Sequence, residues 1–278
     1  MVDDINENSG ESGNSHAGER RWLPRQVISG EDERIFSVLP ESVLTNFLNP
    51  TSENALLWNV IYLLAQPTIS LTDLLNIRPL WGNLNEETKI DDTLTPYYWG
   101  FDVNGARLYK LDEVLLMIEG SGPKTEVDLF LLGESNLILV ESKRRSGFGR
   151  CSRFTKHRCP EMYLAAGDDR STCGYWEGEK SRFTNYLTME PHPKPDSESP
   201  ACYRHYQLAR TLTIGHELAD LLGCEFHLWV FTPRLHWSKL EKEWLDFTER
   251  VQDDSLWRRL RVIAWEDIQE MASRSGER

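Results

Sequence analysis

The strongest constraint on the fold lies in residues 126–143, which read EVDLFLLGESNLILVESK. Two strongly apolar runs flank GESN, four residues that favour a turn, and this pattern predicts a β-hairpin. Asp128, Glu141 and Lys143 lie in and beside these runs, where a charge is costly unless another group compensates it. We hypothesise that a metal ion compensates the two carboxylates.

The register of the hairpin determines which charges meet. If GESN forms the loop, Leu132 pairs with Leu137, and Asp128 lies directly opposite Glu141. Opposed side chains have Cβ atoms about 4.5–5.5 Å apart, and like charges at that distance destabilise a sheet. A half-buried hairpin with its charges at a solvated margin, where Lys143 neutralises the acids, is the alternative. The second run is apolar on both faces, as in an interior strand, which favours a functional carboxylate pair.

Composition indicates a globular chain. The 278 residues suffice for a sizeable core, and ten Trp, nine Tyr and ten Phe argue against a disordered protein. No apolar run is long enough to span a bilayer, so we expect no membrane partner. The N-terminus lacks a basic lead followed by an apolar segment, which predicts a cytoplasmic location.

The remaining patterns predict one α/β domain at residues 31–278, after a disordered acidic and polar tail at residues 1–30. A helix is expected after Pro50, with Asn49 as a cap, and another from about Cys202 to Leu222. Strand, helix, strand and helix follow, so we expect a central mixed β-sheet flanked by helices. Residues 144–200 are basic, then rich in Gly and Pro, and form a Cys-containing excursion from this core.

The spacing of the charged residues resembles a known superfamily. Asp128, twelve intervening residues and then Glu141-Ser142-Lys143 are similar to the PD-(D/E)XK nucleases, nearest to restriction-endonuclease-like or RecB-like members. Val127 stands where the motif usually has Pro. The resemblance covers about residues 40–272 and implies a restriction-endonuclease-like core that hydrolyses DNA. It implies Mg²⁺, or Mn²⁺, bound by Asp128 and Glu141, with Lys143 assisting the attacking water.

Such nucleases usually add a carboxylate from a helix before the hairpin and a polar residue from a helix after it. Glu53 lies on the apolar seam of its helix and would be a third metal ligand. The alternative is a first-turn acid that complements the helix dipole. Gln207 lies on the seam of the later helix, is similar to the Gln of the RecB-like helix, and would orient water or contact the backbone. The alternative is an amide that satisfies a nearby backbone group.

A basic run follows the hairpin directly. The net charge of −13 would argue against a nucleic-acid partner, but residues 143–158 carry seven Lys or Arg and no acid. We expect this run to bind the DNA backbone, with Phe148 or Phe154 available to stack on a base. A solvated loop is the alternative. The expected phosphate ligands are Arg144, Arg145, Arg150 and Arg153.

The five cysteines do not predict a disulfide framework, because their number is odd and the chain is expected to be intracellular. Cys151, His157, Cys159 and Cys173 could bind Zn²⁺. With Cys202, an iron–sulfur cluster is conceivable, as some RecB-like exonucleases carry one. The spacing lacks close C-x2-C pairs, so packed free thiols are the favoured interpretation.

Two other function classes stay open. The same fold could serve as a non-catalytic DNA-binding or interaction module, although the intact Asp, Glu and Lys set argues against this. An unrelated α/β binding protein could use the hairpin charges as a salt bridge. The sequence is compatible with a homodimer and does not separate endonuclease from exonuclease action.

Overall fold

The computed structural model describes residues 28–30, 33–47, 49, 51–65, 69–82, 91, 93–120, 124, 126–163, 173–177, 180–189 and 200–275. Residues 1–27 of the expected tail lie outside this set. Packing extends back to Ile28, which is buried. Ser29 is held by helix α2 (Glu53–Leu64), because its N–H donates to Asn59 Oδ1 at 2.9 Å and its carbonyl accepts from Trp58 Nε1 at 2.7 Å.

A five-stranded mixed sheet forms the centre of the fold. Its order is β1-β2-β3-β6-β7, with β1 and β2 antiparallel, β2 and β3 antiparallel, and the last two pairings parallel. The strands are β1 (Thr95–Tyr98), β2 (Leu129–Leu132), β3 (Asn136–Ser142), β6 (Glu225–Thr232) and β7 (Leu260–Ala264). The expected α/β fold with a central mixed sheet is therefore confirmed.

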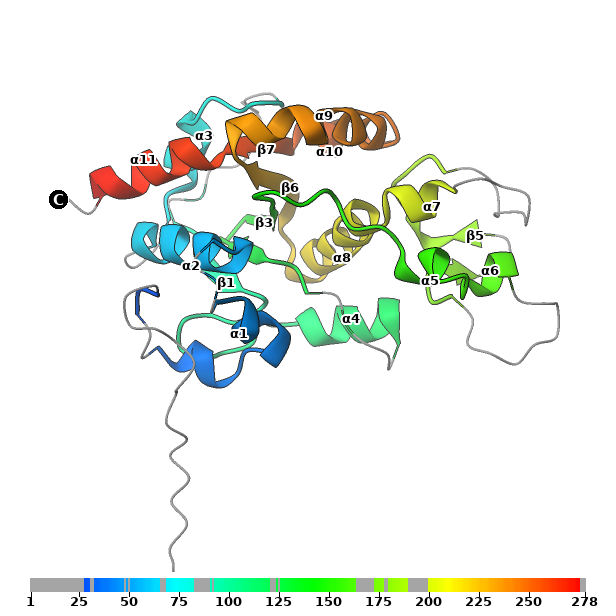
Figure 1. Cartoon of the computed structure of the whole chain (residues 1–278), viewed down its shortest axis with the longest axis horizontal. Helices are drawn as coiled ribbons and strands as arrows, with labels where there is room; N and C mark the ends of the chain where they lie inside the picture. The colour runs from blue at the N-terminus through cyan, green and yellow to red at the C-terminus, as the bar shows by residue number, and fades with distance from the viewer. Residues whose placement is uncertain are drawn as a thin grey trace, which may run out of the picture.

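Helices cover both faces of this sheet, and each face has its own apolar core. Figure 1 shows α2 and α8 on opposite sides of β3 and β6. On the α2 side lie η1 (Arg34–Ser37), α1 (Glu41–Phe47), α3 (Leu71–Asn76) and α11 (Trp265–Ser275). On the other side lie α4 (Leu111–Glu119), α8 (Tyr206–Leu222), α9 (Arg234–Thr248) and α10 (Asp254–Arg258).

Between β3 and α8 the chain forms a lobe of short elements, which Figure 1 shows at the end of the molecule opposite α11. Each described element in it has two to four residues. They are α5 (Ser152–Thr155), α6 (Pro160–Tyr163), β4 (Trp176–Glu177), β5 (Lys180–Ser181), η2 (Arg182–Asn185) and α7 (Ala201–Arg204).

The hairpin has the expected register. Leu132 pairs with Leu137 and Leu129 with Val140, so continuing the count places Asp128 opposite Glu141. Neither face is solvated, because β2 and β3 contribute buried side chains to both apolar cores. A solvated margin for the hairpin charges is therefore excluded.

Two helix boundaries differ from the sequence prediction. Ser52, not Asn49, caps α2, accepting from Ala55 N at 3.1 Å. The helix expected from Cys202 is divided at His205, which adopts φ −101° and ψ 21°. The His205 ring bonds Asp246 of α9 at 2.8 Å, an interaction that the local sequence does not reveal.

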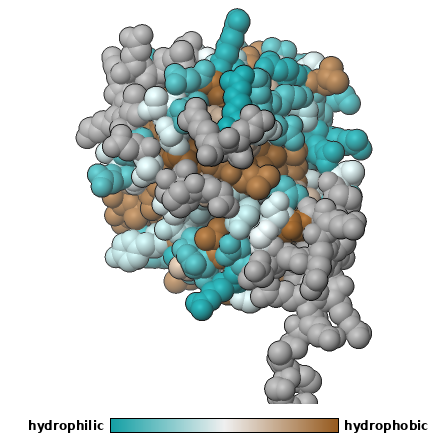
Figure 2. Space-filling view, turned by 90° about the vertical axis from the view of Figure 1, so that its left-hand side faces the viewer, coloured by the Kyte–Doolittle hydropathy of each residue, from teal (hydrophilic) through white to brown (hydrophobic). Residues whose placement is uncertain are grey.

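Among the described residues, no helix is long and apolar enough to cross a membrane. Figure 2 shows the side on the left of Figure 1, where hydrophobic residues gather across the middle of the face among hydrophilic ones. Leu63 of α2 and Val38 beside α1 are 51% and 42% exposed.

Close packing of α8 on β6 sets the height of α8 above the sheet. A Cβ on Gly215 would lie 2.1 Å from the nearest ring atom of Phe226. Ala normally favours a helix over Gly by about 1 kcal/mol, but overpacking a core costs roughly 1–3 kcal/mol. The glycine therefore allows α8 to approach the sheet.

We predict that Gly215→Ala lowers the free energy of unfolding by about 1–2 kcal/mol, because the ring of Phe226 cannot move away freely. Urea denaturation measures the change. The same substitution in a Phe226→Leu background should be less destabilising, since the ring is gone. A Gly215→Ala protein as stable as wild type would show that α8 does not need this close approach.

Candidate active site

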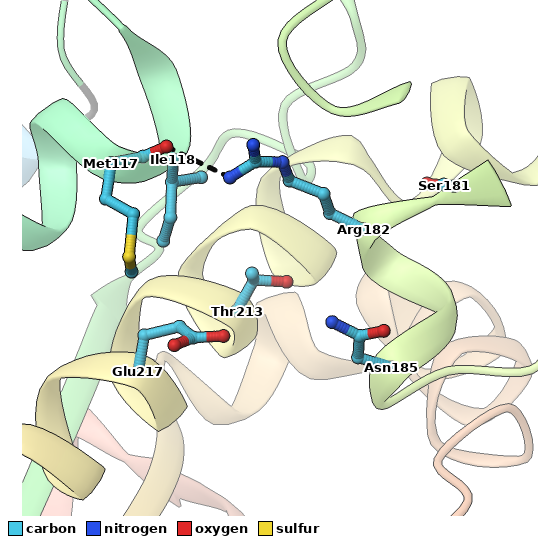
Figure 3. Close-up of a pocket in the computed structure, with 7 residues that line it drawn as sticks. All are labelled: Met117, Ile118, Ser181, Arg182, Asn185, Thr213 and Glu217. Carbon is cyan, nitrogen blue, oxygen red and sulfur yellow. Dashed lines mark hydrogen bonds between the residues drawn. The ribbon is translucent and has the colours of Figure 1, made fainter. Parts of the chain in front are cut away.

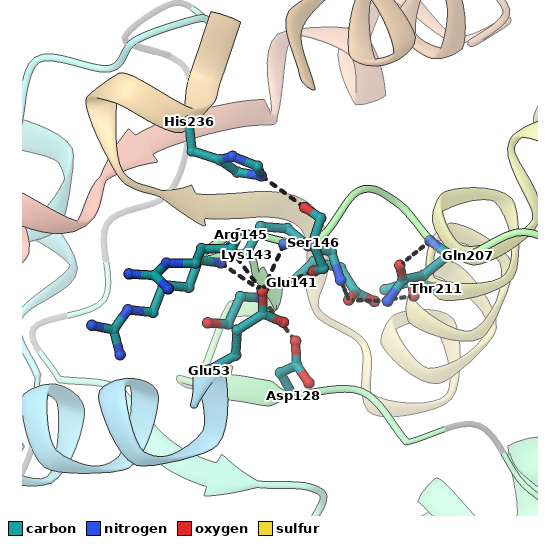
Figure 4. Close-up of polar contacts among 12 residues, drawn as sticks. Glu53, Asp128, Glu141, Lys143, Arg145, Ser146, Gln207, Thr211 and His236 are labelled. Atoms are coloured by element: carbon teal, nitrogen blue, oxygen red, sulfur yellow. Dashed lines mark hydrogen bonds and ion pairs between the residues drawn. The ribbon is translucent and has the colours of Figure 1, made fainter. Parts of the chain in front are cut away.

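The expected site residues meet at the carboxyl end of β3. Glu141 is near the end of β3, Asp128 precedes β2, and Lys143 follows β3. Glu53 is the first residue of α2 and Gln207 the second of α8, so both helices begin at this end of the strand. Figure 4 shows all five side chains converging there.

Glu141 is almost completely buried, with 1% of its surface exposed. Helix α8 holds both carboxylate oxygens: Thr211 Oγ1 donates to Oε1 at 2.6 Å and Gln207 Nε2 donates to Oε2 at 2.7 Å. Lys143 Nζ lies 3.8 Å from Oε2. The carboxylate is therefore fixed in one orientation, which suits a group that must bind a ligand in a defined geometry.

Asp128 is half-buried, and its Oδ2 accepts from Ser142 N at 2.8 Å. Burial, and then the charge of Glu141, raise the pKa of Asp128 to about 7, against the lowering effect of Lys143. Two carboxylates and a lysine thus share a poorly solvated site.

Glu53 anchors the loop that follows β3. Its Oε1 accepts from Arg144 N at 2.7 Å, from Arg145 N and Ser146 N at 3.3 Å each, and from Ser146 Oγ at 2.8 Å. Burial acts to raise the pKa of Glu53, but these hydrogen bonds and the charge of Lys143 hold it below its ordinary value. The carboxylate is therefore ionised, with one oxygen committed to the loop.

A second group holds the same loop from the other side. The buried His236, near the start of α9, bonds the Ser146 carbonyl through Nε2 at 2.8 Å. Because a carbonyl only accepts, the imidazole must donate this bond. The loop is thus fixed by one residue from each face of the sheet.

Gln207 connects the carboxylate to the basic run. The side-chain Nε2 of Gln207 bonds Glu141, and its side-chain Oε1 accepts from Gly149 N at 2.6 Å. The backbone N–H of Gln207 donates to Gly149 O at 3.0 Å. Both ends of the side-chain amide are therefore engaged by protein groups. Its role in orienting water stays a prediction.

Sequence reasoning did not identify Thr211, Ser146 or His236 as site residues. Thr211 follows Gln207 by one helical turn on the same seam, and this i, i+4 spacing is a signal that could have revealed it. Ser146 and His236 come from separate segments whose contact depends on tertiary structure.

The donor set fits a magnesium ion in charge and chemistry. Mg²⁺ prefers oxygen ligands and usually takes one or two protein carboxylates with waters and substrate phosphate. Asp128 and Glu141 provide two carboxylates, and a cation would relieve the repulsion between them. Within the described part of the chain, no three His, Cys, Asp or Glu side chains are arranged to hold a metal ion by themselves.

A groove of about 500 Å³ lies beside Gln207. Its cationic lining residues are Lys124, Arg150, Arg153 and Arg210. Tyr175 and Tyr206 provide aromatic surface, and Glu119 is its acidic member. The groove therefore places basic and aromatic groups next to the residue that holds Glu141.

A smaller hollow of about 160 Å³ lies between α4, η2 and α8 (Figure 3). Arg182 closes one side by donating to Met117 O at 3.0 Å. Thr213 and Glu217 line it from α8, and none of the expected site residues belongs to it. This hollow is therefore separate from the cluster of charged residues at the end of β3.

Most of the basic run is accessible. Arg145, Arg150 and Arg153 are exposed, whereas Arg144 is half-buried. The expected stacking role of Phe148 is wrong, because this ring is 5% exposed and packs in the core, 6.2 Å from Trp244. An aromatic residue in a basic run could serve either use, and only tertiary structure decides between them.

Phe154 and the predicted second metal site lie in the excursion. The Phe154 ring contacts Tyr203, with a centroid distance of 4.3 Å. Cys151, Cys159 and Cys173 are half-buried free thiols, and His157 is exposed. Metal binding by these residues stays a prediction at this point.

Comparison with known proteins identifies the family. No curated protein and no solved structure matches the chain. Residues 49–276 match a family described as Restriction Endonuclease associating with ARP. The match covers most of the chain and all the residues that meet at the end of β3. The chain therefore belongs to this family, and its fold is restriction-endonuclease-like.

Proposed function

We propose that the protein is a metal-dependent nuclease that hydrolyses DNA phosphodiester bonds at the carboxyl end of β3. One observation carries this proposal: the buried Glu141 is held by α8 beside the buried Lys143 and beside Asp128, whose pKa is raised. A purely structural ion pair would need neither a second carboxylate nor an adjoining groove. Family membership supports nuclease chemistry.

Asp128 and Glu141 would hold Mg²⁺ or Mn²⁺. Such an ion polarises a phosphoryl oxygen and lowers the pKa of a bound water. Lys143, 5% exposed, would stabilise the charge that develops on the phosphate, since a cation acts strongly in a poorly solvated site. Glu53 has its Oε1 committed to the loop, so only Oε2 could contribute as a third ligand or orient a water.

The basic groove supports DNA as the substrate. Arg150 and Arg153 come from the basic run, and Lys124 and Arg210 come from other segments. All four cationic side chains line the same groove. Cations of this kind neutralise phosphates, and Tyr206 could stack on a base.

The second candidate is a non-catalytic module that keeps the nuclease fold. The family description favours it in one respect, since it names association with ARP. We propose that the protein associates with ARP and is itself an active nuclease, because Asp128, Glu141 and Lys143 are all present at the site. A cytoplasmic location and a homodimer stay predictions.

We predict that Lys143→Met abolishes Mg²⁺-dependent cleavage of DNA and also lowers stability, because the buried Glu141 loses its counter-charge. Methionine retains most of the buried volume of the lysine stem but removes the cation. Cleavage of circular, linear and single-stranded DNA, with Mg²⁺ omitted and restored, measures the effect. Loss of at least 100-fold in rate is expected, the size typical for removal of one electrostatic stabiliser.

The exposed Lys239→Met on α9 serves as the matched control and should cleave at the wild-type rate. Wild-type protein that cleaves none of these DNAs with Mg²⁺ or Mn²⁺ would favour the non-catalytic module. Equal rates for Lys143→Met and wild type would remove Lys143 from the chemistry.

We predict that wild-type stability in EDTA falls as the pH rises from about 4 to about 7 and then levels off. The folded-state pKa of Asp128 is about 7, above its ordinary value of 3.8, so the folded state retains a proton that the unfolded chain releases. The resulting stabilisation is complete below the ordinary pKa and is lost as the pH rises through about 7. Asp128→Asn should flatten this slope and exceed wild type by about 1–2 kcal/mol at pH 8.

Urea denaturation at several pH values measures both proteins. Mg²⁺ at pH 8 should stabilise wild type and have little effect on Asp128→Asn, because a ligand stabilises only the state that binds it. Asp112→Asn is the control, since its side chain is 73% exposed. Parallel pH slopes for wild type and Asp128→Asn, or equal stabilisation by Mg²⁺, would contradict the carboxylate pair.

We predict that replacing Arg145, Arg150 and Arg153 with Gln weakens DNA binding and makes it less sensitive to salt. Each lost phosphate contact should reduce the slope of log K against log salt by about 0.9 on duplex DNA. Fluorescence anisotropy in the Lys143→Met background measures binding without cleavage. A triple Gln variant of the exposed Arg34, Arg258 and Arg274 should keep the wild-type slope, and an unchanged slope in the first variant would place DNA elsewhere.

A further inference from the structure

Four of the five cysteines belong to the lobe between β3 and α8 (Figure 1). Cys151 is the N-cap residue of α5, Cys159 precedes α6, Cys173 precedes β4, and Cys202 lies in α7. All four are half-buried free thiols. Four separate segments therefore each contribute one sulfur.

Several contacts bring these segments together around Cys202. Cys151 N donates to the carbonyl of Tyr203, the neighbour of Cys202, at 3.3 Å. Trp176 N donates to Cys173 O at 3.0 Å, and the Trp176 side chain hydrogen-bonds Cys202. Cys151 and Cys173 also line the same groove.

The four thiols influence one another electrostatically. Burial raises the pKa of Cys202, and Cys159, Cys173 and Cys151 lie close enough to contribute to the same rise. Negative charge on one sulfur is thus opposed by the others. A cation bound among the sulfurs would reverse this, because metal coordination deprotonates thiols and stabilises their thiolates.

The lobe has little regular structure to hold these segments in place. Its described helices and strands have two to four residues each, and α5 buries none of its four. Short elements with a small core are usually stabilised by disulfides or a structural metal. The segments that carry the four cysteines therefore have no substantial core of their own.

We propose that Cys151, Cys159, Cys173 and Cys202 bind one structural Zn²⁺ through four thiolates. Each thiol releases its proton to solvent and forms one Zn–S bond, in the tetrahedral arrangement typical of structural zinc. The thiols in their present rotamers, like the other described side chains, do not form a closed site, so the side chains must rotate as the metal binds. Cys202 takes the place that the sequence had suggested for His157.

This zinc site would shape the groove without entering the proposed chemistry. Arg150 and Arg153 flank Cys151, and all three line the groove. Fixing Cys151 to the other three segments would hold these cations in place. The inference is independent of the proposed nuclease function, since zinc content is measured on the full chain without any substrate.

The test is the metal content of the full-length protein, purified without chelator and measured by mass spectrometry. We expect one zinc per chain in wild type and less than a fifth of that in Cys159→Ser and Cys202→Ser. Cys224→Ser is the matched control, because Cys224 follows the C-cap residue of α8, outside the lobe, and it should retain full zinc. Wild-type protein stripped of zinc should melt at a lower temperature and recover on adding Zn²⁺.

Cobalt provides a readout that does not require a variant to fold. Co²⁺ added to the stripped wild-type protein should give the intense visible bands of a tetrahedral thiolate complex, and Zn²⁺ should displace them. The proposal is overturned by wild-type protein that holds no zinc and gives no such bands. It is equally overturned by zinc that persists in Cys202→Ser, by an iron–sulfur chromophore, or by a disulfide among the four cysteines.

Discussion

The site depends on one buried carboxylate. Placing a carboxylate such as that of Glu141 inside the fold carries a desolvation penalty of several kcal/mol unless hydrogen bonds and a counter-charge compensate it. The hydrogen bonds come from Thr211 and Gln207 of α8, and the counter-charge comes from Lys143, which follows β3. Because both donors lie on α8, the position of that helix on the sheet determines the orientation of the carboxylate.

The loop after β3 is fixed by hydrogen bonds from both faces of the sheet. Glu53 accepts three backbone N–H groups of the loop, and His236 bonds the carbonyl of Ser146. The chain therefore leaves β3 along a fixed path, with Lys143 at its start. Glu53 and His236 therefore fix the backbone that connects the carboxylates to the basic run.

The sequence predicted the fold class, the strand register and the meeting of Glu53 and Gln207 with the hairpin. These rest on local patterns: alternation in two strands, a turn of four residues and helical seams. It could not predict that Phe148 is buried, or that His205 divides the expected helix, because both depend on α9. The family match shows the restriction-endonuclease-like fold and assigns no role to single residues.

The basic groove and the carboxylates are coupled through a short stretch of backbone. Gly149 exchanges hydrogen bonds with Gln207, and Cys151 donates to Tyr203, so residues 149–151 lie along the start of the α8 region. Gln207 in turn holds Glu141. A continuous series of hydrogen bonds therefore connects the backbone at Gly149 with the Glu141 carboxylate through Gln207, and the basic groove adjoins this series.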